Sequence, residues 1–279
     1  MRTLFLLPCL LLCACSDNET FPQTHDPYVT DAATPLGCMP NLDGRIDAAE
    51  MQAFFGVTAS FLVSPAGQER QVDVAGALQL GGQRVWDWSA DIAGDQIAKF
   101  GASPVEGKWY ASSFPTGTFV SSFDAGHTID AVYRSDESTI YLLGLASAEE
   151  NPPEGQTLMP YKDAVALYHF PLEVGGSWVS TGQVENGVFK GLQYAAKDTY
   201  EVRIDASGEL RLPSLTFTQA LRVRTKVTVQ PAAGQSVTQQ QVSFVFECFG
   251  EVARATSRAG ETEEDFTVAS EVRRLGIEP

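Results

Sequence analysis

Four side chains with oxygen donors lie close together in the first part of the sequence: Asn41, Asp43, Asp47 and Glu50. Carboxylate and amide oxygens are the ligands that calcium prefers in proteins, and a glycine among them allows the sharp turn of a loop around the ion. Gly44 stands directly after Asp43. The residue types and their spacing therefore indicate a calcium site.

The segment 41–50 resembles the calcium loop of EF-hands and dockerins. The resemblance implies a ligand set of Asn41 at the third position, Asp43 at the fifth, the Arg45 carbonyl after the turn, Asp47 at the ninth position and Glu50 as the bidentate ligand. Met39 stands at the first position, where the pattern has a carboxylate. One ligand and one negative charge are therefore missing from the expected set.

A second interpretation of this segment needs no metal. Asp43 and Gly44 would form a turn, and Asp47 and Glu50 have the spacing of a capping box at the start of a helix. This interpretation predicts a short helix that ends at Gly56, because a glycine commonly follows the last helical turn.

Trp86 and Trp88 are separated by one residue, so a strand would place both indoles on one face. An accessible pair of indoles could stack on a sugar or line a lipid cavity. The same spacing is typical of core residues, and this alternative stays open beside the platform.

The three histidines do not form a catalytic or zinc-binding pattern in the sequence. His25, His127 and His169 are far apart, although Asp124 and Asp130 flank His127. The chain lacks the motifs of zinc metalloproteases, of serine hydrolases with a nucleophile elbow, and of phosphate-binding loops. We expect a non-enzymatic protein, with an envelope hydrolase as the alternative.

Alternation of apolar and polar residues dominates the chain after position 37. In 199–205, Tyr200, Val202 and Ile204 share one face, and 221–229 alternates over nine residues. Further strands are expected at 57–64, 70–80, 84–90, 108–114, 117–123, 128–135 and 139–147. The pattern predicts a mainly β fold, an antiparallel curved sheet that forms a half-barrel or a sandwich, with one short N-terminal helix.

Two segments between the strands bear on domain organisation. Asn186-Gly187 predicts a two-residue hairpin turn, because both central residues of a type I′ turn need positive φ. The stretch 148–156 has the composition of a linker. We expect 37–279 to be a single β-rich domain in which 148–156 is a surface loop or divides two lobes.

The first residues read as a secretion signal: one arginine, an apolar run too short to span a bilayer, and small residues before a cysteine. Leu12-Cys13-Ala14-Cys15 resembles the lipobox of bacterial lipoproteins. The resemblance implies a signal peptide over 1–14, a lipid on Cys15 and a flexible tether over 15–36. Ser16 is similar to the sorting signal for the outer membrane of the cell envelope.

Of five cysteines, Cys9 and Cys13 would leave with the signal peptide and Cys15 would carry the lipid. Cys38 and Cys248 remain, and in an oxidising compartment the simplest expectation is a disulfide between them. Two separate buried thiols are the alternative.

Composition excludes some classes of protein. A formal net charge of −16 repels nucleic acid, so we expect no nucleic-acid partner. With 44% hydrophobic residues the chain is long enough to bury a full core, which excludes global disorder.

Several stretches together resemble secreted β-rich lipoproteins of Gram-negative bacteria: 38–46, 86–89, 168–178 and 210–223. The last two are similar to strand-turn-strand patterns in half-barrels of the lipoprotein-carrier type. The resemblance implies a membrane-tethered binding or structural module of the envelope. A carrier or sensor of a hydrophobic ligand in the half-barrel is the alternative, and an unidentified envelope protein is the other possible partner.

Overall fold

The computed structural model describes residues 37–52 and 56–276 of the chain. The expected signal peptide 1–14, the lipidated Cys15 and the tether 15–36 lie outside the described residues. Residues 37–279 form one unit by their internal contacts, and the expected division at 148–156 is a loop between two neighbouring strands of one sheet, β10 and β11.

The elements are short in the first half of this unit and long in the second. In chain order they are β1 (Arg45–Ile46), α1 (Ala48–Gln52), β2 (Ala59–Val63), β3 (Arg70–Gln71), β4 (Ala77–Leu78), β5 (Arg84–Asp87), β6 (Gln96–Phe100), β7 (Ser103–Pro104), the 3₁₀ helix η1 (Ala111–Ser113), β8 (Phe119–Ser122), β9 (Ile129–Ser135), β10 (Thr139–Ser147), β11 (Leu158–His169), β12 (Leu172–Glu173), β13 (Ser177–Phe189), β14 (Leu192–Arg211), β15 (Thr216–Pro231), β16 (Val237–Phe246), β17 (Gly250–Ser257) and β18 (Val268–Leu275).

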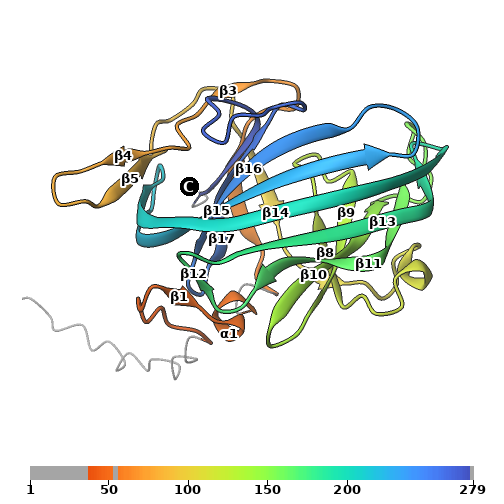
Figure 1. Cartoon of the computed structure of the whole chain (residues 1–279), viewed down its shortest axis with the longest axis horizontal. Coiled ribbons are helices and arrows are strands. Elements are labelled where there is room, and N and C mark those ends of the chain that lie inside the picture. Colours follow the sequence, from red (N-terminus) through yellow and green to blue (C-terminus); the bar gives the residue numbers. More distant parts are fainter. Residues whose placement is uncertain (1–36, 53–55, 277–279) are drawn as a thin grey trace, which may run out of the picture. The chain divides into compact units, whose positions relative to one another are not determined.

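The mainly β fold predicted from the alternation is confirmed. Thirteen strands follow one another in the order β6-β2-β18-β17-β16-β15-β14-β13-β11-β10-β9-β8-β7, and β3, β4 and β5 join this sheet at its side. The pairings are antiparallel except that β5 runs parallel to the end of β14. Figure 1 shows the long strands β13 to β16 side by side, with α1 and β1 below them.

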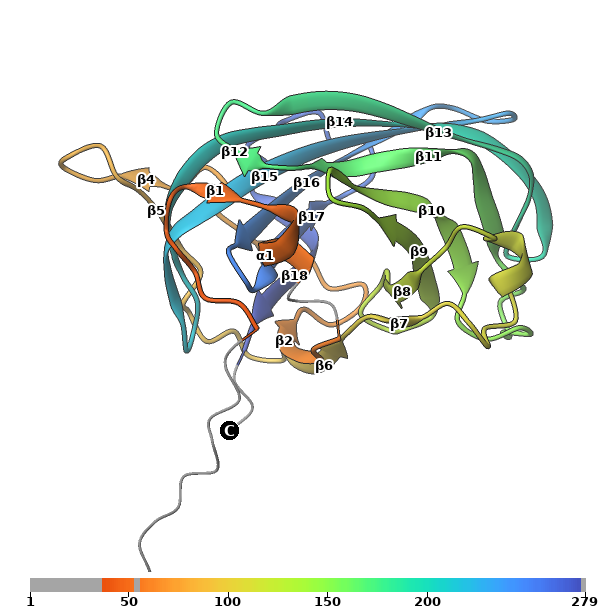
Figure 2. The same ribbon diagram turned by 90° about the horizontal axis from the view of Figure 1, so that it is seen from below.

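The sheet curves strongly but does not close. Its two edge strands, β6 and β7, are separated in the chain only by Gly101 and Ala102. Seen from below, β13 and β14 lie at the top and β2, β6 and β7 at the bottom of a wide curve (Figure 2). The expected half-barrel matches this open, curved arrangement.

The hairpin turn predicted at Asn186-Gly187 is wrong. Gly187 lies inside β13 beside a register shift, paired with Tyr194. The turn follows four residues later, at Lys190-Gly191, where φ is 48° and 77°. Both values are positive, as a type I′ turn requires, and a lysine takes the place that the sequence pattern assigns to asparagine.

The strand predicted over 108–114 is also wrong, because this segment is a series of tight turns around η1. The N–H groups of Ala111, Ser113 and Phe114 each donate to the carbonyl three residues earlier. The Tyr110 and Phe114 rings pack edge to face at 6.0 Å and bury this segment against the sheet. Aromatic packing therefore replaces strand pairing here.

Two cores occupy opposite faces of the long strands. On the outer face, Phe244 of β16 packs against the indoles of Trp86 and Trp88 at 4.8 and 5.1 Å. On the inner face, Tyr200, Val202 and Ile204 of β14 are buried together, as their alternation predicts.

The N-terminal segment is fixed to the inner side of the sheet by three kinds of contact. The disulfide Cys38–Cys248, which the sequence predicts, joins Cα atoms 5.6 Å apart. The Leu42 N–H donates to the buried Glu247 carboxylate at 2.7 Å. Ile46 and Met51 are buried in the inner core. A covalent bond and apolar packing therefore hold α1 in place.

We expect reduction of Cys38–Cys248 to lower the free energy of unfolding, because the bridge closes a loop of 210 residues. Loop-closure entropy gives an upper value of about 5 kcal/mol for such a loop. Urea unfolding followed by tryptophan fluorescence, with and without reductant, measures the change. The Cys38→Ser/Cys248→Ser double variant is the control and should not respond to reductant. An unchanged midpoint for the reduced native chain would contradict the expectation.

Candidate functional site

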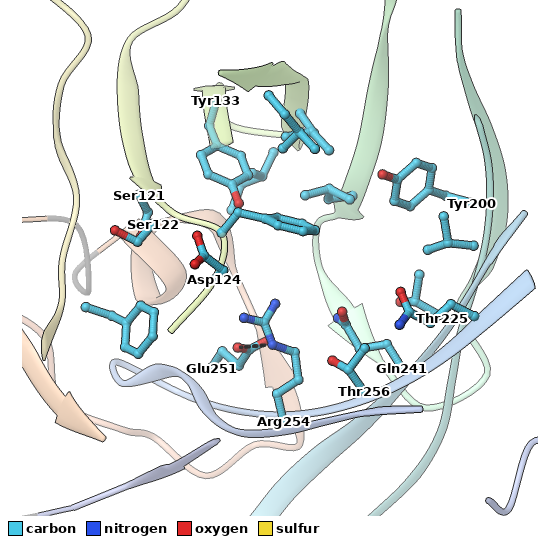
Figure 3. Close-up of a pocket in the computed structure, with 18 of the residues that line it drawn as sticks. Ser121, Ser122, Asp124, Tyr133, Tyr200, Thr225, Gln241, Glu251, Arg254 and Thr256 are labelled. Atoms are coloured by element: carbon cyan, nitrogen blue, oxygen red, sulfur yellow. Dashed lines mark ion pairs between the residues drawn. The ribbon is translucent and has the colours of Figure 1, made fainter. Parts of the chain in front are cut away.

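The concave face of the sheet lines a partly open cavity of about 500 Å³. Its wall is built from β8 to β11 on one side and from β14 to β18 on the other, so that segments far apart in the chain face each other across it (Figure 3). Sites for small molecules commonly have volumes of about 300 to 1,000 Å³. The cavity therefore has the size of a ligand site.

Much of the wall is aliphatic. Ile140, Leu142 and Leu145 come from β10, Met159 from β11, and Val227 and Val229 from β15. Strand alternation places Ile140 with Leu142 and Val227 with Val229 on one side of the sheet, and the register shift between Leu142 and Gly144 brings Leu145 to the same side. The cavity can accommodate an apolar chain along these strands.

The segment 45–52 lies at the inner side of the curve and contributes to the wall. Met51 of α1 is 4% exposed and lines the cavity. Figure 2 shows α1 inside the curve, close to β17. The N-terminal contacts described above therefore help to shape the cavity.

Two arginines from the last strands point into the cavity, and each lies beside a glutamate. Arg273 has three close partners: Nε donates to Glu271 at 2.5 Å, Nη2 donates to the Phe123 carbonyl at 2.5 Å, and the guanidinium lies 4.3 Å from the centre of the Phe100 ring. It is a structural cation that ties β18 to the edge of the cavity.

Arg254 is less fully paired. Its Nε lies 3.4 Å from Glu251, marked by the dashed line in Figure 3, and this buried atom has no hydrogen-bond partner among the described residues. Burial lowers the pKa of Arg254, but the carboxylates of Glu251 and Glu271 outweigh this and raise it above its ordinary value. Arg254 is therefore a charged group, and Glu251 is its counter-charge.

A carboxylate surrounded by tyrosines lies on β14. The Tyr161 hydroxyl donates to Asp198 Oδ2 at 2.7 Å and lies 3.3 Å from the Tyr200 hydroxyl. Asp198 Oδ1 is buried and has no hydrogen-bond partner among the described residues. Burial raises the pKa of Asp198, and the hydrogen bond from Tyr161 opposes this only in part.

Gly182 of β13 makes room for the ring of Tyr161. Gly182 is paired with Asp198 across the ladder, and a Cβ atom at Gly182 would lie 2.6 Å from Tyr161 Cδ1. Such a distance is far below van der Waals contact, so any side chain here would displace the tyrosine. The absence of a side chain at Gly182 allows Tyr161 to reach Asp198.

The aspartate-rich turn has the hydrogen bonds of the metal-free interpretation. Asn41 Oδ1 accepts from the Asp43 N–H, Asp43 Oδ1 accepts from the Arg45 N–H, and Glu50 Oε2 accepts from the Asp47 N–H at 2.9 Å. The last bond is one half of a capping box, and α1 follows it. Burial is the main cause of a raised pKa at Glu50.

The calcium ligand set stays a prediction. Asn41 Nδ2 donates to Glu50 Oε1 at 3.1 Å, so the two ends of the expected loop do meet. No group of three or more His, Cys, Asp or Glu side chains is arranged as a metal site within 37–52 and 56–276.

The structure places Trp86 and Trp88 in the outer core, where they are 0% and 6% exposed. Neither indole lines the cavity. Of the two alternatives for this pair, the position in the core agrees with the structure. The ring of Phe244 packs against both indoles, where a ligand would have to bind.

The described histidines contact hydroxyl groups. His127 Nδ1 lies 2.8 Å from Ser122 Oγ, and His169 Nδ1 lies 3.1 Å from Thr139 Oγ1. Neither ring has a hydrogen bond or an ion pair to a carboxylate in the described part of the chain. Asp124 and Asp130, which flank His127 in the sequence, bond elsewhere.

Sequence reasoning missed the residues that give the cavity its polar character: Asp198, Tyr161, Tyr200, Glu251 and Arg254. One signal was present for Asp198, because it precedes Tyr200, Val202 and Ile204 at the same spacing of two and so shares their inward face. A charged residue at one of the alternating strand positions that are otherwise apolar and face inward is a candidate site residue. Arg254 and Glu251 had no such signal, because both faces of β17 are largely buried.

Comparisons of the chain with protein-family models, with curated proteins and with solved structures found no match. The functional argument therefore depends on the geometry of the cavity.

We compare the free energy of unfolding of the native chain with that of Asp198→Asn. We expect the native value, minus the value of the variant, to decrease as pH rises from about 4. The folded-state pKa of Asp198 is raised, so the folded chain holds this proton more tightly than the unfolded chain. The stabilising contribution is then complete below the unfolded-state pKa and is lost as pH rises through the folded-state pKa. Urea unfolding at a series of pH values measures the difference.

The matched control for this series is Asp163→Asn, which removes an exposed aspartate from β11, two strands away from β14 in the sheet. Two outcomes would contradict the expectation. The difference in free energy of unfolding between the native chain and Asp198→Asn would increase with pH, or it would not depend on pH.

Proposed function

We propose that this protein is a lipid-anchored, non-enzymatic binding protein of the cell envelope, which holds a hydrophobic or amphiphilic small molecule inside its curved sheet. The observation that carries the proposal is the cavity of about 500 Å³ on the concave face, with its aliphatic wall and its few buried polar groups. Such a combination is typical of sites for small molecules.

The cavity favours a ligand-binding role over a purely structural one. Protein interiors are close-packed, and voids larger than a water molecule are few. Apolar side chains that line an open volume lack packing partners on that side. A module with only a structural role has no use for this volume, whereas a carrier or sensor needs it.

An anchored position suits a protein that handles amphiphilic molecules. The resemblance of 12–15 to a lipobox supports a lipid on Cys15, with 15–36 as the tether and the outer membrane as the location. A diacylglycerol with a further acyl chain holds such a protein at the bilayer. The described part of the chain contains no helix with the length and apolar character needed to cross a membrane.

The contacts of the histidines favour binding over hydrolysis. General-base catalysis on a serine usually needs a histidine that a carboxylate orients. His127 contacts the Ser122 hydroxyl through Nδ1, and no carboxylate among the described residues holds its ring. We therefore propose binding as the role of this cavity.

Partial filling of the cavity should weaken binding of an apolar probe. Val227 lines the cavity from β15, and Val227→Trp would occupy part of its volume. We expect the native chain to bind the uncharged fluorophore N-phenyl-1-naphthylamine at a saturable site, and Val227→Trp to weaken this binding about tenfold or more. Fluorescence titration measures both affinities.

Leu192→Trp is the matched control, because Leu192 is 73% exposed and lies outside the cavity wall. This variant should bind as the native chain does. If the native chain shows no saturable binding, or if both variants bind equally well, the proposed function is wrong.

The anchor has its own test. Cys15→Ala should stop incorporation of labelled palmitate and shift the protein from the membrane fraction to the soluble fraction of expressing cells. Cys9→Ala should change neither result, since Cys9 lies within the expected signal peptide. Incorporation of palmitate into Cys15→Ala would contradict the proposed anchor.

A further inference from the structure

Among the side chains that line the cavity, negative charges outnumber positive charges. Four carboxylates and two guanidinium groups face it, namely those of Asp124, Asp198, Glu251, Glu271, Arg254 and Arg273. The two arginines lie beside Glu251 and Glu271. Two aspartates, Asp124 and Asp198, are left without a cation.

Asp124 is satisfied by its own turn. It accepts hydrogen bonds from the backbone N–H groups of Gly126, Thr128 and Ile129, and from the Thr128 hydroxyl. A carboxylate that accepts several N–H bonds is stable without a cation. Asp124 therefore needs no external partner.

Asp198 has no comparable partners. Its single hydrogen bond comes from the Tyr161 hydroxyl, and Oδ1 has none among the described residues. No ion pair involves Asp198 in the described part of the chain. A partly buried carboxylate without a counter-charge destabilises the fold, and such an exception in a cavity wall calls for an explanation.

Aromatic rings surround this carboxylate. Tyr161 and Tyr200 approach each other through their hydroxyl groups, and Tyr194, four residues before Asp198, also lines the cavity. The negative charge of Asp198 adds to the burial that raises the pKa of Tyr194. Aromatic rings and carboxylates bind ammonium ions in proteins, and the hydroxyl groups of Tyr161 and Tyr200 add hydrogen-bond acceptors here.

We infer that the cavity binds an amphiphile with a cationic ammonium group, whose charge pairs with Asp198 among the rings of Tyr161, Tyr194 and Tyr200. This inference rests on the proposed function and specifies the chemistry of its ligand. The ammonium supplies the counter-charge that the chain itself lacks at Asp198.

The register of the sheet separates Asp198 from the arginine-glutamate pairs. Arg254 is paired with Ser243, Ser243 with Val223, and Val223 with Ile204 of β14. Asp198 lies six residues before Ile204 on the same strand. At about 3.3 Å per residue the two levels are roughly 20 Å apart.

The residues at and next to the Asp198 level are suited to an alkyl chain. Val227 is paired with Tyr200, and Val229 is paired with Asp198, both on β15. Both valines line the cavity, and Met159 faces it from β11. The ammonium group therefore lies at the Asp198 level, and the apolar chain lies against the valines.

The test compares three probes that share a dodecyl chain and differ only in the head group: dodecylamine, dodecanol and dodecanoic acid. Each displaces N-phenyl-1-naphthylamine from the full chain carrying Cys15→Ala, so that no attached acyl group competes. We expect dodecylamine to displace the fluorophore at about one tenth of the concentration that dodecanol needs, because measured coupling energies of close charge pairs correspond to a factor of about ten or more. Dodecanoic acid should be the weakest.

Asp198→Asn should make dodecylamine and dodecanol displace the fluorophore at equal concentrations, and its urea-unfolding curve shows that the variant is folded. Asp163→Asn, with the same change in charge at an exposed position, should keep the preference. Equal displacement by amine and alcohol in the native cavity, a preference for the acid, or a preference that survives Asp198→Asn would overturn the inference.

The proposed function fails in a different way, because then neither the fluorophore nor any of the three probes binds. The comparison of head groups on the unsubstituted cavity decides the inference even if Asp198→Asn does not fold.

Discussion

The ladder between β14 and β15 is the constraint on which the rest of the structure depends. It runs from the pair Ala196–Pro231 to the pair Arg211–Thr216 with two register shifts. Because side chains alternate across a sheet, a slip of one residue would turn the cavity-facing set outward and the outer set inward. The register therefore determines that Asp198, Tyr200, Thr225 and Val227 face the cavity together.

Both faces of this ladder are covered, which makes a slip costly. Towards the end of β14, Gly208 to Arg211 pair with β5, and Trp86 of β5 lies against the outer core. Gly208 has no side chain, and a Cβ atom there would lie 2.3 Å from the Arg84 carbonyl oxygen. On the inner face, Ile204 packs with Ile46 and Met51 of the N-terminal segment. The disulfide to Cys248 secures that segment, so the shape of the cavity depends on contacts at both ends of the folded unit.

The sequence was sufficient for the type of fold because alternation is a local property. Tyr200, Val202 and Ile204 follow one another at a spacing of two, and their shared burial needs no knowledge of the partner strands. The turn between β13 and β14 shows what local sequence patterns cannot predict. Asn186-Gly187 has the better turn composition, but pairing over the length of both strands moves the turn to Lys190-Gly191. The segment 108–114 contains strand-forming aromatic residues, yet their rings pack against one another and against β8 to β10 instead of pairing as a strand.

The candidate site was harder to predict than the fold, because its residues come from strands that are far apart in the chain. Tyr161 and Asp198 are 37 positions apart, and only the register of β11, β13 and β14 brings them together. The aspartate-rich turn attracted attention because its residues are contiguous, and the structure gives it hydrogen bonds that begin a helix. Contiguous motifs are visible in a sequence, whereas a cavity inside a curved sheet is visible only after the strands have been ordered.

The most direct measurement is a crystal structure of the folded unit grown with dodecylamine. The account predicts density for one alkyl chain along Val227 and Val229, with the ammonium nitrogen within hydrogen-bond distance of an Asp198 carboxylate oxygen. An empty cavity, or a dodecylamine bound only on the outer face of the sheet, would contradict it.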